Sequence, residues 1–320
     1  MPKLEIHAFT EDFLDGAAEL LAARHRRHRA AEPLLPAAYE QPAAARDAIV
    51  EVLALDDPEG VAATRGGRIV GYLIGIRKGE MWGPNVWIEP AAHAVEQAED
   101  VRDLYAAAAR GWVDAGRKAH YAVVPATDGE LVDAWFRLGF GAQHAYGIRE
   151  LPDALWPNGI RELDERDFDD VIALASQLQD HQRDTPVFSG LPREGPGQEN
   201  ELRNELREEA ETPTIGSFVA ELDGRVVGNI VVCSIDQSKA VHYGLARPEH
   251  MSFLAFALTD ESVRGSGVGL ALTQAGFAWA RAQGYTAMIT DWRETNLLAS
   301  RFWTARGFRP TFRRLHRLIA

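Results

Sequence analysis

The segment Val263-Arg264-Gly265-Ser266-Gly267-Val268-Gly269-Leu270 decides the fold of the C-terminal half of this chain. It follows the apolar run 253–259 and precedes residues 268–282, where apolar side chains recur with the helical period of about 3.6 residues. Glycines between a strand and a helix leave backbone N–H groups open, and the helix N-terminus behind them adds unpaired donors and about half a positive charge. The segment therefore predicts a cradle for a phosphate or pyrophosphate.

Two common phosphate-binding motifs do not fit this segment. A P-loop requires Gly-Lys-Ser/Thr, whereas Leu270 follows Gly269. A dinucleotide-binding fingerprint requires a third glycine where this chain has Leu270 or Leu272. The pattern that fits is Arg-x-x-Gly-x-Gly, formed by Arg264, Gly267 and Gly269. A glycine-rich turn that only begins a helix is the alternative interpretation.

The chain repeats a pattern at the scale of a domain. Residues 63–72 resemble residues 220–229, and both predict a β-hairpin; residues 135–140 resemble residues 303–308 in the same order. Two prolines and a glycine punctuate the segment between the copies. The sequence therefore predicts two domains, at 1–150 and 159–320, joined by a linker at 151–158.

Each copy shows the order strand, helices, hairpin, strand, helix, strand, helix, strand, which indicates an α/β or α+β layer fold. In the second copy the expected strands lie near 159–164, 215–221, 225–235, 251–259, 285–291 and 309–318. The expected helices lie near 166–181, 198–210, 268–283 and 296–306.

A second signature follows the glycine segment by about thirty residues. It runs from Asn296 to Phe308 and contains an Asn, an Ala, an aromatic pair and Gly-Phe. Together with the glycine segment it resembles the GNAT superfamily, the acetyl-CoA-dependent N-acetyltransferases. The resemblance covers 159–320 well, and it covers the first half only by the order of strands and helices. It implies two tandem GNAT-like domains, each with a mixed, mostly antiparallel sheet flanked by helices.

The resemblance also implies a site for acetyl-CoA as co-substrate, without a metal. The strand before the loop would pair with the pantetheine arm, one of its N–H groups would polarise the thioester carbonyl, and the glycine segment would hold the pyrophosphate. An aromatic residue in the last signature would pack against the cofactor. The implied cofactor-binding residues are Ala257, Leu258, Thr259, Arg264, Gly265, Ser266, Gly267, Val268, Gly269, Asn296 and Trp303.

The implied reaction is direct attack of an amine on the thioester, which requires a base for the amine and a proton for the leaving thiolate. The position that commonly holds an acid tyrosine in the superfamily holds Trp303 here, and an indole does not ionise usefully. Tyr243 and Tyr285 are nearby tyrosines in the sequence, and Glu249 and His250 precede the cofactor strand as candidate bases. A solvated loop position is the alternative for Glu249 and His250.

The first half lacks the features of the cofactor segment. The matching stretch, 87–96, contains no glycine, and the next helix is expected to begin with Glu96, Glu99 and Asp100, whose carboxylates would cap it. We therefore expect 1–150 to be a degenerate copy that does not bind the cofactor in the usual way. It would instead complete a substrate cleft or bury a shared interface.

The composition limits the class of protein and its partners. Hydrophobic residues make up 46% of the chain, charged ones 25%, and the formal charge is −13, which argues against nucleic-acid binding and mildly favours a cationic amine. The single cysteine, Cys233, excludes an internal disulfide and a cysteine-based zinc site. The sequence shows neither an apolar stretch of the ~20 residues that cross a bilayer nor a signal peptide, so we expect a cytoplasmic protein without a membrane partner.

These observations predict an N-acetyltransferase that moves an acetyl group from acetyl-CoA to a primary amine of a small molecule, with a long loop at 184–200 over the acceptor site. A non-catalytic acyl-CoA-binding regulator is the main alternative, because Trp303 replaces the acid tyrosine. A nucleotide-binding module that uses the same glycines is a further alternative. The acceptor, the acyl-chain length and the oligomeric state stay open.

Overall fold

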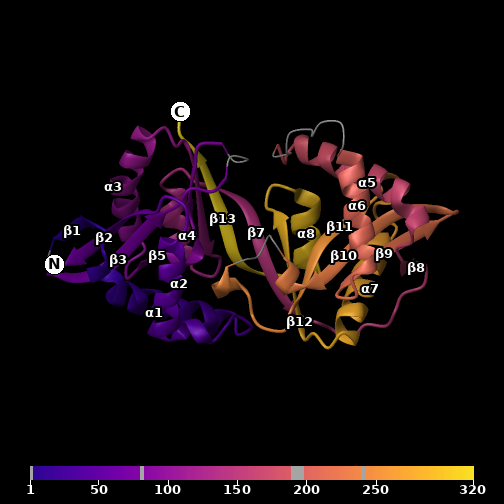
Figure 1. Cartoon of the computed structure of the whole chain (residues 1–320), viewed down its shortest axis with the longest axis horizontal. Coiled ribbons are helices and arrows are strands. Elements are labelled where there is room, and N and C mark those ends of the chain that lie inside the picture. The colour runs from indigo at the N-terminus through magenta and orange to yellow at the C-terminus, as the bar shows by residue number, and fades with distance from the viewer. Residues whose placement is uncertain (1–2, 80–82, 189–197, 239–242) are drawn as a thin grey trace. The chain divides into compact units, whose positions relative to one another are not determined.

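The computed structural model describes residues 3–79, 83–188, 198–238 and 243–320 (Figure 1). The chain forms two compact units. Unit 1 consists of Met1–Tyr146, His242–Pro248 and Pro310–Ala320, and unit 2 consists of Gly147–Val241 and Glu249–Arg309.

Unit 1 contains a sheet in the order β1-β2-β3-β5 and a second group of paired strands, β4-β6-β13. Helices α1 and α3 pack on opposite faces of the first sheet (Figure 1). The bounds are β1 (Leu4–Ala8), α1 (Leu14–Ala31), α2 (Pro42–Leu53), β2 (Glu59–Arg65), β3 (Arg68–Gly75), β4 (Asn85–Ile88), β5 (His93–Val95), α3 (Asp100–Asp114), β6 (Ala119–Pro125), α4 (Gly129–Phe136) and β7 (Gly141–Glu150).

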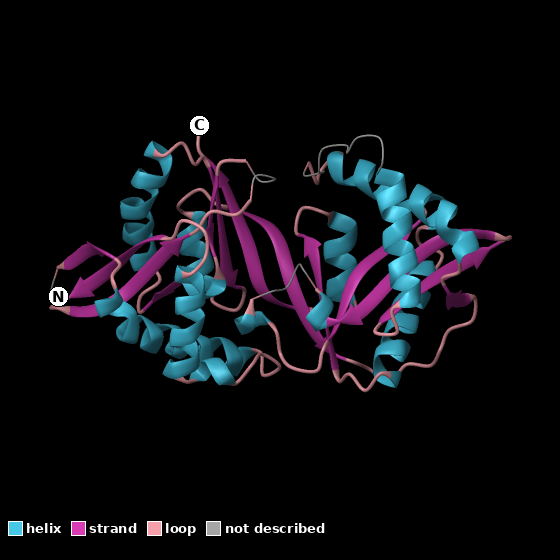
Figure 2. Cartoon of the chain, in the orientation of Figure 1, coloured by secondary structure: helices cyan, strands magenta, loops and turns pink. Residues whose placement is uncertain are grey.

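Unit 2 is built on the strand order β8-β9-β10-β11-β12. Helices α5 and α6 cover one face of these strands and α7 covers the other (Figure 2). The bounds are β8 (Ile160–Glu162), α5 (Phe168–Arg183), α6 (Gln198–Glu211), β9 (Ile215–Leu222), β10 (Arg225–Ser234), β11 (Ser252–Thr259), α7 (Val268–Ala282), β12 (Ala287–Arg293) and α8 (Leu297–Ala305). The strand that follows, β13 (Arg309–Leu318), belongs to unit 1 from Pro310 on.

The core of unit 2 explains why α7 lies so close to the sheet. A β-carbon on Gly228 of β10 would lie 2.8 Å from Leu272 and 3.3 Å from Val268, both on α7. Only glycine leaves room for this approach. On the other face, Leu258 of β11 is buried with Phe168 and Val219. The start of α7 is therefore fixed directly beside the end of β11.

The predicted strands and helices of the second copy are confirmed to within a few residues, and the mixed α/β fold class is confirmed. The hairpin predicted from residues 63–72 is β2 and β3, and the hairpin predicted from 220–229 is β9 and β10. Gly284 follows α7 with a φ of 86°, as its place after the helix predicts. The strand predicted at 159–164 is shorter and spans only Ile160–Glu162.

Two segments from the second half of the chain fold with unit 1. The predicted division into 1–150 and 159–320 did not include this arrangement. The C-terminal strand β13 pairs antiparallel with β6, from Phe312 opposite Pro125 to Leu318 opposite Ala119. The segment His242–Pro248 also belongs to unit 1. The partner of a strand is a tertiary property, so the residue pattern within β13 does not reveal it.

The acidic start of α3 differs from its prediction in one respect. No side chain caps this helix by a hydrogen bond, so the expectation that Glu96, Glu99 and Asp100 cap it is wrong. Arginines bind these carboxylates instead: Arg68 pairs with Glu96, Arg65 pairs with Asp100 through both oxygens, and Glu99 pairs with Arg102 and Arg137. Asp100 still lies in the first turn, where its charge favours the helix dipole.

Among the described residues, no helix is both long enough and apolar enough to cross a membrane. The predicted acceptor loop at 184–200 lies largely outside the described residues, since the description stops at 188 and resumes at 198.

We expect the free energy of unfolding to fall as the pH drops below about 6.5, because of three buried histidines in unit 1. Burial lowers the pKa of His25 to about 4 and that of His28 and His93 to about 3. The unfolded chain therefore binds more protons than the folded chain between these values and about 6.5, at a cost of about 1.4 kcal/mol per pH unit for each histidine. Urea unfolding at a series of pH values measures this slope.

His93→Asn provides the control for this prediction, since it removes one of the three groups. Below pH ~6.5, the slope of the free energy of unfolding against pH should decrease by the contribution of one proton, about 1.4 kcal/mol per pH unit. Above pH ~6.5 the slope should stay the same. An unchanged slope in this variant would mean that His93 is not held neutral in the fold.

Candidate cofactor site

The glycine segment forms the start of a helix that no side chain caps. Gly267 immediately precedes α7 with a φ of 97°, a left-handed conformation that favours glycine. The first turn of α7 contains no acidic residue. A β-carbon on Gly265 or Gly267 would meet no heavy atom within 4 Å, so the space beside both glycines is open. This is the geometry of an anion cradle.

The N–H groups of this segment divide into two sets. The first helical hydrogen bond runs from Ala271 N to Gly267 O, so the N–H groups of residues 268–270 precede it and have no partner in the helix. Ser266 differs, because its N–H and its hydroxyl both donate to Val263 O, at 3.2 and 2.6 Å. Ser266 therefore shapes the loop, and the available donors are those of the glycines and of the first turn of α7.

Arg264 adds a mobile positive charge to the cradle. Its Nη1 lies 3.2 Å from Glu261 Oε1, and 32% of its side chain is exposed, against 81% for Glu261. An ion pair this exposed contributes little to stability. The guanidinium can therefore exchange the carboxylate of Glu261 for a phosphate at small cost.

Strand β11 has one edge that is only partly paired. Along its other edge it pairs with β10 from Ser252 to Thr259, with a bulge at Ala255. Its parallel pairing with β12 covers only three residue pairs, from Ser252 opposite Met288 to Leu254 opposite Thr290. Beyond this point the two strands separate, which leaves residues 255–259 with one edge available to an extended ligand.

Thr290 holds the point where the strands separate. Its hydroxyl donates to Leu254 O at 3.0 Å, and both side chains are buried. Asp291 follows directly and is half-buried, so it is the titratable residue closest in the strand register to the separation. The sequence analysis missed Asp291; an acidic residue at the carboxyl end of the buried run 287–290 was the available signal.

Asn296 caps the start of α8, and the aromatic pair Phe302 and Trp303 lies within this helix. Asn296 Oδ1 accepts hydrogen bonds from Leu298 N and Ala299 N, both at 3.1 Å, which leaves its amide nitrogen as the donor for a ligand. Trp303 is buried, with its ring centroid 4.9 Å from that of Phe302 and 5.6 Å from that of Phe308. Its predicted contact with the cofactor stays a prediction.

Phe302 is a second residue that the sequence analysis missed. A β-carbon on Gly269 would lie 3.5 Å from the Phe302 ring and 3.4 Å from Thr259 Oγ1. Phe302 therefore lies against the first turn of α7 and the end of β11. Its place beside Trp303 in the aromatic pair was the available signal.

The three catalytic candidates belong to parts of the chain other than the glycine segment. Glu249 and His250 form an exposed turn before β11, and Ser252 to Ala255 alone spans about 10 Å of extended chain. Tyr243 folds with unit 1, where the Nζ of Lys78 lies 5.1 Å from its ring centroid, and burial raises the pKa of its hydroxyl well above 10. Tyr285 follows the far end of α7. The roles of Glu249, His250 and Tyr243 stay predictions.

Other chemistry finds no support among the described residues. No group of three or more His, Cys, Asp or Glu side chains in this part of the chain is arranged to hold a metal ion. Cys233 is buried, and burial raises the pKa of its thiol to about 11, which makes it a poor nucleophile.

The family comparison agrees with this geometry. The sequence profile of the acetyltransferase (GNAT) family matches residues 176–308, a span that contains the glycine loop, the separated strands and α8. Residues 176–308 therefore resemble an acetyltransferase domain of the GNAT family.

Solved structures extend the likeness of fold to the whole chain. A GCN5-related N-acetyltransferase from Sphaerobacter thermophilus is 15% identical, with 98% of this chain and 95% of that chain covered and a TM-score of 0.57. The glucosamine N-acetyltransferase region of a fungal multi-domain GH3 β-N-acetylglucosaminidase is 14% identical, with 99% and 38% covered and a TM-score of 0.51. No match was found among the curated proteins.

We expect Thr290→Val to lower the free energy of unfolding by about 1–3 kcal/mol, because it leaves a buried carbonyl without its hydroxyl donor. Thr273→Val is the matched control. Thr273 is also buried and its hydroxyl donates to Gly269 O at 2.8 Å, but that carbonyl also accepts the helical N–H of Thr273. Urea unfolding of both variants should show the larger loss for Thr290→Val, and equal losses would contradict the role of Thr290.

Proposed function

We propose that this protein is an N-acetyltransferase that moves an acetyl group from acetyl-CoA to a primary amine of a small molecule by direct attack. The observation that supports it most is the pairing of two features in unit 2: the uncapped start of α7 and, next to it, a strand with one free edge. The first suits a diphosphate and the second suits an extended chain with amide groups. Coenzyme A contains both.

The residues of the cradle suggest how acetyl-CoA binds. The diphosphate would accept hydrogen bonds from the N–H groups of Gly265, Gly267 and the first turn of α7, with Arg264 as the counter-charge. The pantetheine amides would pair with residues 255–259, and Asn296 would donate from its amide nitrogen. A main-chain N–H of the free edge would polarise the thioester carbonyl.

The reaction joins the amine nitrogen to the acetyl carbon and breaks the bond between that carbon and sulfur. The amine must lose a proton before or during attack, and we propose Asp291 as its acceptor, because it stands where β11 and β12 separate. The released sulfur must gain a proton. Trp303 cannot supply it, so a water molecule or the proton taken from the amine would neutralise the thiolate.

Unit 1 serves, in this proposal, as a degenerate copy that does not bind acetyl-CoA in the usual way. The start of α3 carries Asp100 and Asp103 in its first turn, and Glu96 precedes it, so a diphosphate would meet like charge. The net charge of −13 supports a cationic amine as the acceptor.

We expect Gly267→Asp to weaken acetyl-CoA binding at least tenfold, because it adds a carboxylate and a β-carbon to the cradle. Gly224→Asp is the matched control: Gly224 also has a positive φ, of 78°, and open space around it, but it lies in the β9–β10 turn. Isothermal titration calorimetry of both variants measures the affinity. Equal affinities would refute the cradle as the diphosphate site.

We expect wild-type protein to release free thiol from acetyl-CoA in the presence of a suitable amine, and Asp291→Asn to lower kcat at least tenfold with little change in acetyl-CoA affinity. A thiol assay across a panel of mono- and diamines measures both. Glu249→Gln and His250→Gln are the comparison variants for the alternative bases. Acetyl-CoA binding without thiol release for any amine would favour the non-catalytic regulator.

A further inference from the structure

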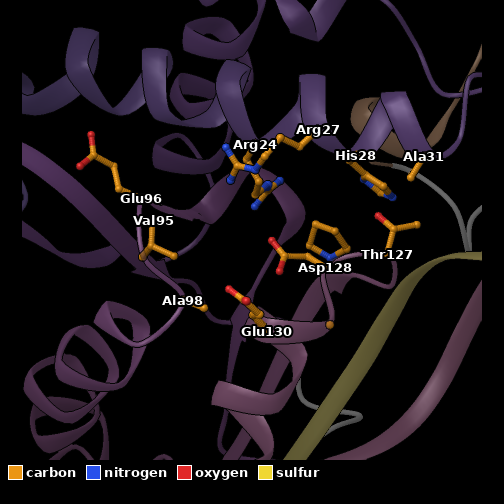
Figure 3. A pocket seen from close by; sticks show the side chains of 12 residues that line it. Arg24, Arg27, His28, Ala31, Val95, Glu96, Ala98, Thr127, Asp128 and Glu130 are labelled. Atoms are coloured by element: carbon orange, nitrogen blue, oxygen red, sulfur yellow. The ribbon is translucent and has the colours of Figure 1, made fainter.

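Unit 1 contains a cavity of about 460 Å³ beside α1. Figure 3 shows Arg24 and Arg27 of α1 reaching in from one side, and Asp128 and Glu130, at the start of α4, from the other. Val95 and Ala98, between β5 and α3, also line it. The cavity therefore lies between α1 and the starts of α3 and α4.

Arg24 is a buried cation, and the charge of Asp128 acts on it. Only 3% of its surface is exposed, and the described residues place no carboxylate within ion-pair distance of it. Its guanidinium donates to the carbonyls of His93 and Pro90, the latter at 2.6 Å, and its Nε has no partner. Burial lowers its pKa to about 10, so the side chain stays charged at neutral pH. Asp128 offsets part of this charge, and an anion in the cavity would offset more of it.

A second cation and two acids complete the lining. Arg27 is exposed one helical turn after Arg24, and the described residues provide no ion pair for it. On the opposite side, Asp128 accepts a hydrogen bond from Leu131 N at 3.0 Å, while Glu130 is exposed and has no ion pair in the described part of the chain. The cavity therefore has a cationic side and an anionic side.

We propose that this cavity binds a small zwitterion of the amino-acid type, with its carboxylate on Arg24 and Arg27 and its ammonium group facing Asp128 and Glu130. Paired guanidinium groups bind a carboxylate through several charge-assisted hydrogen bonds. A diphosphate would be repelled by the two acids, and a simple cation would be repelled by the two arginines. The inference does not depend on the acetyltransferase proposal, because all the residues that carry it belong to unit 1.

Calorimetric titration of the full chain with the common amino acids and short ω-amino acids tests this proposal. We expect at least one zwitterion to bind ten or more times tighter than acetate and ethylamine, which each carry one of its two charges. Arg27→Gln should weaken that binding at least tenfold, whereas Arg110→Gln, an exposed arginine on α3 outside the cavity lining, should not change it. Arg27 is chosen because replacing the buried Arg24 could unfold unit 1.

Glu130→Gln separates a zwitterion from a simple anion. It should weaken zwitterion binding and leave acetate binding unchanged. The proposal is overturned if no zwitterion binds more tightly than its single-charge analogues, if Arg27→Gln and Arg110→Gln behave alike, or if Glu130→Gln changes nothing.

Discussion

The early separation of two parallel strands is the constraint on which the rest of unit 2 depends. β11 and β12 pair over three residue pairs and then part. Buried backbone groups must find partners, so the separation is possible only with substitutes. The Thr290 hydroxyl supplies one at Leu254 O, and the bulge at Ala255 adjusts the other edge of β11. The remaining groups face outward, and the cradle is built beside them.

In each unit a pair of parallel strands stops pairing early, but the backbone groups beyond that point find different partners. In unit 1, β4 pairs with β6 only up to Ile88, after which β5 pairs with β3. There Arg24 donates to the carbonyls of Pro90 and His93, whereas unit 2 leaves the edge open. Arginine–carboxylate pairs stand at the start of α3, where α7 has its uncapped glycine segment. The edge is therefore open to a ligand in unit 2, whereas in unit 1 the side chain of Arg24 binds the corresponding carbonyls.

Local signals predicted most of the fold and the glycine segment of the candidate site. The glycine pattern at 265–269, the helical period of 268–282 and the hairpins all depend on residues near one another, so one sequence suffices to find them. The pairing of β13 with β6, the burial of Tyr243 in unit 1 and the position of Arg24 depend on contacts between residues far apart along the chain. Strand register placed Asp291 beside the separation of β11 and β12, and helix packing placed Phe302 against α7.

The pairing of β13 with β6 makes the folding of unit 1 depend on residues that follow unit 2 along the chain. During synthesis, β6 is therefore made well before the strand that pairs with it. Until then, one edge of β6 stays uncovered, and such an edge is prone to pair with other chains. A fragment that stops before unit 2 would therefore lack the strand that covers this edge of β6, and deletion of β13 would damage unit 1.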